Sequence, residues 1–146
     1  MKTETAKICA ILLGLTAFAA LQDLSGTVFG AKPPLLLVFG SFAGVPAAVV
    51  AGLFADALGD MPFGCSAALF ATTAIFVRKA QAAATLTVSA AAAIHGIWIS
   101  AWGGAVNLST IAAGFLMAML LSPVMSRFIE NARKHIGIEH VKEIAK

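Results

Sequence analysis

The stretch VAGLFADALGDMPFG, residues 50–64, decides how this chain folds. It places an acidic residue, Asp56, in an apolar segment, and a turn rich in Gly and Pro follows before hydrophobicity resumes. A carboxylate costs on the order of 2.5–3.5 kcal/mol at the bilayer centre and less near the interface, so it needs a compensating interaction. The stretch therefore predicts a membrane helix that ends near a carboxylate, a turn, and a second membrane helix.

The composition of the whole chain agrees with a membrane protein. The 146 residues are 60% hydrophobic and 12% charged, with a mean hydropathy of +0.92. A soluble domain is about 45–50% apolar and about 25% charged. The net charge of +3 is no sign of nucleic-acid binding, because in a membrane protein the position of the basic residues matters more than their sum. We therefore expect an all-α polytopic membrane protein in contact with the lipid bilayer, and no nucleic-acid partner.

Apolar runs recur along the chain at residues 8–20, 35–42, 47–58, 63–77, 82–102 and 105–125. The second and third runs are shorter than the roughly 20 residues that a straight spanning helix needs. They are compatible with two short spans, with a pair that dips into the membrane and returns, or with one broken span. The first run ends in small residues like a secretory signal, but a retained first helix is the simpler interpretation.

The basic residues favour one topology. With six crossings and a cytoplasmic N-terminus, Lys32 is the one of the ten basic residues that falls outside. Five crossings would divide these residues across the membrane, against the positive-inside rule. We expect a compact bundle of six, alternatively five, transmembrane helices over residues 1–126, with Pro123 placed to kink the last. Residues 127–146 are expected to form a basic amphipathic cytoplasmic tail on the inner membrane surface, alternatively a solvated tail.

Asp56 has three interpretations at this stage. Main-chain N–H groups of the following turn could satisfy its carboxylate, which would make it a structural residue. It could instead contact a partner or another helix of the bundle. The third interpretation is coupling to a proton or cation.

His95 lies in the middle of an apolar run, where an ionisable residue is a candidate for a functional site. No second ligand stands three or four residues away, so a metal site is not predicted. We expect a neutral histidine bonded to a neighbouring helix, near Asn107 or Ser109. Cys9 and Cys65 form no CxxC motif and are expected to behave as small hydrophobic residues. No nucleophile arrangement or phosphate-binding loop is evident, so we predict neither an enzyme nor a cofactor.

Three stretches carry a resemblance to a known family: Leu21-Gln22, PPLLLV at residues 33–38, and GLFADALGDMPFG at residues 52–64. Together they resemble the rod shape-determining membrane protein MreD, a small six-helix protein whose signature has the form G-L-x-x-D…P-x-G. The resemblance covers about residues 21–77, and the second half agrees in hydropathy and length. It implies an integral scaffold of the bacterial inner membrane that serves cell elongation and peptidoglycan synthesis. The implied partner is an MreC-like membrane protein, with the MreB filament and cell-wall synthases reached indirectly.

The resemblance also implies a set of partner-binding or structural residues around the third and fourth helices. They are Pro33, Gly52, Asp56, Gly59, Pro62 and Gly64. The alternative is the substrate-binding S subunit of an energy-coupling-factor vitamin transporter, which is also small, six-helical and rich in alanine. Its pocket would lie near the outer face and would be built from His95, Trp98, Trp102 and Asn107.

Overall fold

The computed structural model describes residues 2–29, 32–59, 62–104 and 107–144, which are helical apart from short connections. The predicted all-α class is confirmed for these residues, since none of them lies in a strand. The elements are α1 (Lys2–Phe29), α2 (Leu35–Ala43), α3 (Val45–Leu58), α4 (Cys65–Lys79), the 3-10 turn η1 (Gln81–Ala83), α5 (Ala84–Trp102) and α6 (Leu108–Ile144).

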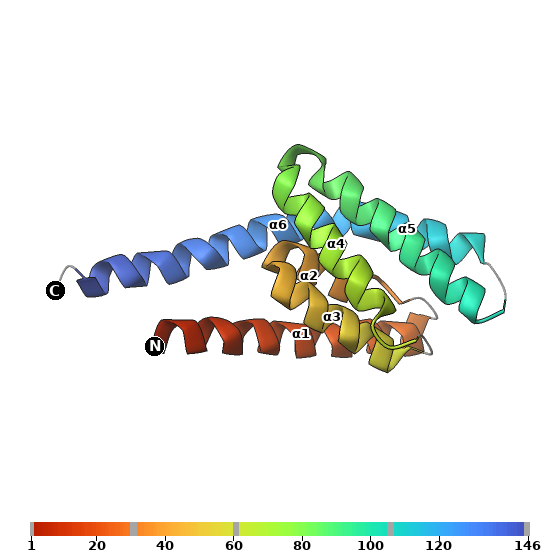
Figure 1. Cartoon of the computed structure of the whole chain (residues 1–146), viewed down its shortest axis with the longest axis horizontal. Coiled ribbons are helices and arrows are strands. Elements are labelled where there is room, and N and C mark those ends of the chain that lie inside the picture. The colour runs from red at the N-terminus through yellow and green to blue at the C-terminus, as the bar shows by residue number, and fades with distance from the viewer. Residues whose placement is uncertain (1, 30–31, 60–61, 105–106, 145–146) are drawn as a thin grey trace.

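The helices run back and forth between two ends of the bundle (Figure 1). We call the end where α1 begins and α6 ends the terminus end. At the opposite end, the loop end, α1, α3 and α5 finish and α2, α4 and α6 begin. Both α1 and α6 extend past the shorter helices at the terminus end, where the α2–α3 and α4–α5 connections also lie.

Three segments of the described chain are long and apolar enough to cross a membrane: Ile8–Val28, Gln81–Trp102 and Leu108–Ala132. Helix α3 is a shorter apolar helix of 14 residues, and α2 has only 9. An α-helix rises 1.5 Å per residue, so α2 alone covers about 14 Å, roughly half of a hydrocarbon core. The structure thus agrees with a membrane protein built around three long helices.

The first helix is longer than its apolar run predicted. The apolar run ends at residue 20, yet α1 continues through the polar residues that follow to Phe29. The hydroxyls of Ser25 and Thr27 donate to main-chain carbonyls one turn earlier in the same helix, at 2.7 and 2.8 Å. These bonds satisfy the two hydroxyls inside α1, so the polar residues need no partner outside the helix.

The last helix contains Pro123, and it is one helical element from Leu108 to Ile144. Membrane helices tolerate proline where side chains or neighbouring helices satisfy the freed carbonyls. The boundary expected between residues 126 and 127 lies within this helix, so residues 127–144 continue α6 in helical form.

Small residues bring α2 and α3 together. The turn between them is Gly44, whose φ of +128° lies in a region that side chains rarely adopt. In α2, a Cβ on Gly40 would lie 2.9 Å from the Cβ of Ala51 in α3, so the helices touch at a distance that only glycine permits. Close approach of this kind is how membrane helices gain packing energy in the absence of a hydrophobic drive.

One buried hydroxyl in α2 makes no hydrogen bond. Ser41 is 1% exposed, and its Oγ has no partner. An unsatisfied buried polar group carries a desolvation cost of about 1–3 kcal/mol. We predict that Ser41→Ala leaves the protein as stable or raises its unfolding free energy by about 1 kcal/mol, measured by thermal melting in detergent. Ser122→Ala is the matched control, because the buried Ser122 Oγ donates to the Ala118 carbonyl at 2.6 Å. A larger loss for Ser41→Ala than for the control would contradict the assignment.

Candidate functional site

The carboxylate of Asp56 caps the helix that follows it. Its Oδ2 accepts a hydrogen bond from the Gly64 N–H at 2.7 Å, and its Oδ1 accepts one from the Ser66 N–H at 3.0 Å. The side chain is buried, with 3% exposure. The first N–H groups of a helix have no partner within the helix, and a negative charge at that end also complements the helix dipole. Main-chain N–H groups of the turn and of the next helix thus satisfy this carboxylate within the bundle.

Gly52 allows α3 and α4 to touch beside this cap. A Cβ on Gly52 would lie 2.3 Å from the Cα of Ala67 and 2.4 Å from its main-chain nitrogen. No side-chain rotation can relieve such a contact, because the opposing atoms belong to the α4 backbone. The glycine and the carboxylate one turn later therefore act together: one sets the helix separation, and the other bonds the helix end.

Main-chain hydrogen bonds and a left-handed glycine stabilise the turn between α3 and α4. Gly59 follows α3, and its N–H points to the Asp56 carbonyl at 3.4 Å. The carbonyl of Pro62 accepts the Cys65 N–H at 3.2 Å, and Gly64 adopts a left-handed conformation with φ of +100°. Gly52, Asp56, Gly59, Pro62 and Gly64 therefore each have a local structural role in the α3–α4 hairpin.

A second long-range cap lies at the same end of the bundle. Gln22 of α1 accepts the Leu36 N–H of α2 on its Oε1 at 3.1 Å. The carbonyl of Pro33 accepts the Leu35 N–H at 2.8 Å, so this proline supports the start of α2. Helices α2 and α4 are therefore both capped at the loop end by a side chain of the preceding helix.

His95 has a partner different from the one predicted. Its Nε2 lies 2.9 Å from the Oγ of Ser66, within hydrogen-bond distance, and the imidazole meets the Phe70 ring edge-on with centroids 5.2 Å apart. The predicted bond to a neighbouring helix is present, but its partner is Ser66 of α4 and not a group near Asn107 or Ser109. Since Ser66 also donates its N–H to Asp56, a continuous set of polar contacts joins α3, α4 and α5.

Asn107 caps the start of α6. Its Oδ1 accepts both the N–H and the hydroxyl of Ser109, at 3.1 and 2.7 Å. This is an N-cap, the commonest use of asparagine beside a helix. Trp98 and Trp102 are 40% and 65% exposed, near the loop end of α5. Of the four residues of the alternative pocket, the structure places only His95 on the cavity described next.

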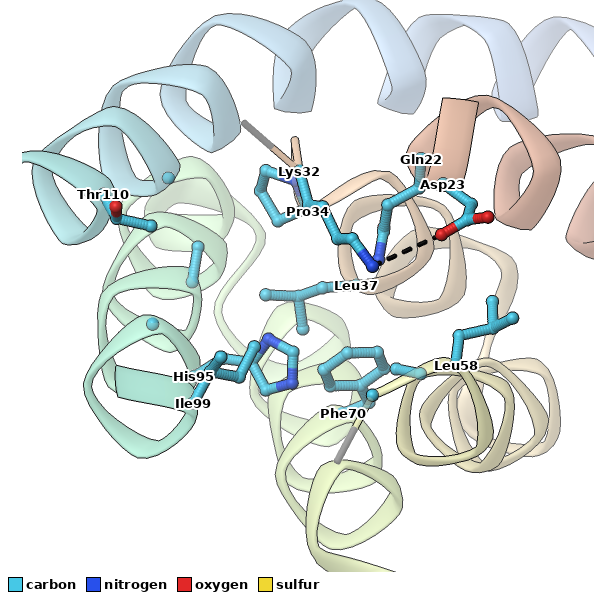
Figure 2. A pocket seen from close by; sticks show the side chains of 15 residues that line it. Gln22, Asp23, Lys32, Pro34, Leu37, Leu58, Phe70, His95, Ile99 and Thr110 are labelled. Atoms are coloured by element: carbon cyan, nitrogen blue, oxygen red, sulfur yellow. Dashed lines mark hydrogen bonds and ion pairs between the residues drawn. The ribbon is translucent and has the colours of Figure 1, made fainter. Parts of the chain in front are cut away.

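A cavity of about 330 Å³ lies among the helices. Every α-helix or its flanking residue contributes to the lining, which consists of Gln22, Asp23, Lys32, Pro34, Leu37, Ala55, Leu58, Gly59, Phe70, Ala92, His95, Gly96, Ile99, Thr110 and Gly114. Figure 2 shows Leu37, Phe70 and His95 close together on one side of it. The Asp56 hairpin thus borders the cavity through Ala55 and Gly59, residues adjacent to the cap and the turn.

An ion pair lies on the wall of this cavity. The Nζ of Lys32 is 3.3 Å from the Oδ1 of Asp23, and both side chains are about half exposed, at 53% and 51%. In Figure 2 the lysine reaches over the cavity toward α1, while Thr110 of α6 stands across from it. The cavity therefore combines an apolar base with a mixed-charge rim, the arrangement of many binding sites.

No sequence pattern pointed to the rim residues Asp23, Lys32 and Thr110. They come from α1, the α1–α2 connection and α6, so no spacing along the chain relates them. Ser66 was also missed, because its contact with His95 joins two helices. The only local signal was the position of Ser66 two residues after Gly64, at the start of a helix.

The described residues contain no group of three His, Cys, Asp or Glu side chains that could hold a metal ion. Cys9 and Cys65 are free thiols, the first exposed and the second partly buried. We compared the chain with protein-family models, curated proteins and solved structures, and none of the three comparisons found a match.

Proposed function

We propose that this chain is a non-catalytic, multi-pass scaffold of the bacterial inner membrane that serves the cell-elongation machinery. Its direct partner in this proposal is an MreC-like membrane protein, which connects it to the MreB filament and the cell-wall synthases. The observation that carries the proposal is the α3–α4 hairpin. The residues of the MreD-like signature meet there, and Asp56 and Gly64 bond directly.

The proposed topology has six membrane crossings with both termini in the cytoplasm. It is supported by the arrangement of the helices, since α1 begins and α6 ends at the same end of the bundle (Figure 1). Arg78 and Lys79, in the last turn of α4, belong to that terminus end, whereas Lys32 belongs to the loop end. Basic residues are enriched on the cytoplasmic side of membrane proteins, so the loop end faces outward.

The cavity and its surroundings are the surface that we assign to the MreC-like partner. Large apolar side chains are exposed around the loop end, including Leu58, Ile99, Trp102 and Leu108 at 43–78%. Exposed apolar groups rimmed by polar ones mark protein interaction sites, and the Asp23–Lys32 pair supplies such a rim. A segment of the partner that enters the cavity would cover both the exposed apolar side chains and the Asp23–Lys32 pair.

Affinity purification of the tagged protein from its native membranes in mild detergent tests this proposal. Mass spectrometry should identify an MreC-like protein among the proteins retained. We predict that Thr110→Phe, which fills the cavity from an exposed position, lowers its recovery by about tenfold, the effect of losing one interface anchor. Thr16→Phe, at an exposed position on α1 away from the cavity, is the matched control and should retain the partner.

Two results would contradict the proposal at different levels. Absence of an MreC-like protein from the unaltered chain would reject the scaffold function. Equal recovery with Thr110→Phe and Thr16→Phe would keep the scaffold but reject the cavity as its docking surface.

A second candidate function is supported by the cavity volume. At about 330 Å³ it falls within the range of about 300–1,000 Å³ that is typical of small-molecule sites. That volume favours the S subunit of a vitamin transporter, in which Lys32 and His95 would contact the substrate. The same purification separates the two candidates, because a transporter subunit would retain a transmembrane coupling protein and ATPases instead.

A further inference from the structure

A second hollow lies on the outside of the bundle, between α4 and α5. It is an open groove of about 410 Å³, lined entirely by side chains of these two helices. Phe76 and Leu86 stand at its sides with 57% and 65% of their surface exposed. The groove is separate from the cavity of Figure 2, with which it shares no lining residue.

Each hydroxyl group that lines this groove donates a hydrogen bond to a carbonyl of its own helix. Thr72 donates to the carbonyl of Ala68, Thr73 to that of Leu69, and Thr87 to that of Ala83, each one turn earlier in its own helix. These three hydroxyl donors are therefore occupied, and none remains to bind a polar ligand. The groove suits a hydrocarbon chain.

Two cations stand at one end of the groove. Residues 69, 72 and 76 of the α4 wall are spaced as one helical stripe, and Lys79 continues that stripe three residues further on. Arg78 precedes it, and both side chains are exposed. Residues 61–129 contain no Asp or Glu, and within the described chain neither cation makes an ion pair. Two unpaired positive charges thus stand at the terminus end of the groove.

We propose that this groove binds an anionic phospholipid, with an acyl chain along α4 and α5 and the headgroup phosphate at Arg78 and Lys79. The apolar groove and the two cations match the two parts of a single amphiphile. Basic residues between membrane helices recognise acidic headgroups, and each basic residue near the membrane surface adds to the attraction. The site is independent of the partner surface proposed above, because the groove and the cavity share no lining residue.

Lipid titration of the full chain followed by native mass spectrometry tests this assignment. The probes are phosphatidylglycerol and phosphatidylcholine with identical acyl chains, added to protein in mild detergent. Arg78→Gln combined with Lys79→Gln should lower phosphatidylglycerol binding by about tenfold or more, toward the phosphatidylcholine level. The matched control combines Arg127→Gln with Lys134→Gln, which removes two exposed cations from α6 and should leave binding within about twofold.

A groove-filling variant separates the two parts of the site. Ala90→Phe should weaken phosphatidylglycerol binding although both cations remain, whereas Ala113→Phe, at an exposed position on α6, should not. The proposal is overturned if the unaltered protein binds both lipids equally, or if both charge variants lose binding alike. It is also overturned if Ala90→Phe binds like the unaltered chain, because the groove would then be free for another occupant such as a partner helix.

Discussion

Replacing Gly52 with alanine is expected to push α3 and α4 apart, because its added Cβ makes the shortest contact of any described glycine. The added Cβ would lie 2.3 Å from the Cα of Ala67, where real Cβ atoms are not found. Overpacking of a close helix contact costs about 3 kcal/mol, at the upper end of its usual range, and lowers the melting temperature by about 10 °C in a chain of this size. Thermal melting in mild detergent, followed by circular dichroism, measures the shift.

Gly114→Ala provides the control for this experiment. The nearest atom to a Cβ at Gly114 is the Ala92 carbonyl oxygen at 3.9 Å, an ordinary contact distance. Alanine favours a helix over glycine by about 0.8–1.0 kcal/mol, so this variant should melt at the same temperature or higher. If Gly52→Ala melted like Gly114→Ala, the close approach of α3 and α4 would be rejected.

Replacing Asp56 with alanine is expected to free the start of α4. Two main-chain N–H groups would lose their acceptors: that of Gly64, which is partly buried, and that of Ser66, which is buried. An unsatisfied buried donor costs about 1–3 kcal/mol, so the variant should lose about 3 kcal/mol in total. Asp56→Asn keeps one acceptor oxygen and should lose about half as much. Chemical unfolding in detergent gives these free energies.

Asp23→Ala is the matched control at the same end of the bundle. Its carboxylate is half exposed and pairs with Lys32 at 3.3 Å, a surface ion pair worth about 0–1 kcal/mol. A similar loss for Asp23→Ala and Asp56→Ala would show that Asp56 does not cap α4. A normal stability of Asp56→Ala with loss of the MreC-like protein would indicate direct partner contact.

Gly52 and Asp56 both have partners inside this protein. Gly52 contacts Ala67, and Asp56 bonds the start of α4, so both act within the protein. A partner at the loop end would meet the hairpin they hold in place rather than the carboxylate itself. Variants of Gly52 and Asp56 are therefore expected to affect partner binding through the fold, whereas Thr110→Phe acts at the surface.

Several features could be predicted from residues alone because they depend on local chemistry. The apolar runs predicted the helices, and the Gly- and Pro-containing turn predicted the break between α3 and α4. The cost of an unpaired carboxylate predicted that Asp56 needs hydrogen-bond donors nearby. The extension of α1 to Phe29 escaped prediction, because hydropathy marks the membrane-buried part of a helix and does not report polar turns that remain helical.

The tertiary structure alone decided which helices share a contact. The pairing of His95 with Ser66, the cap that Gln22 provides to α2, and the cavity all join residues from different helices. Helix periodicity determines which side of a helix is apolar, but in a membrane every side is apolar, so it does not determine which neighbour that side meets. Close approaches at small residues such as Gly52 determine which helices pack against each other. These approaches can be seen only in the packed structure.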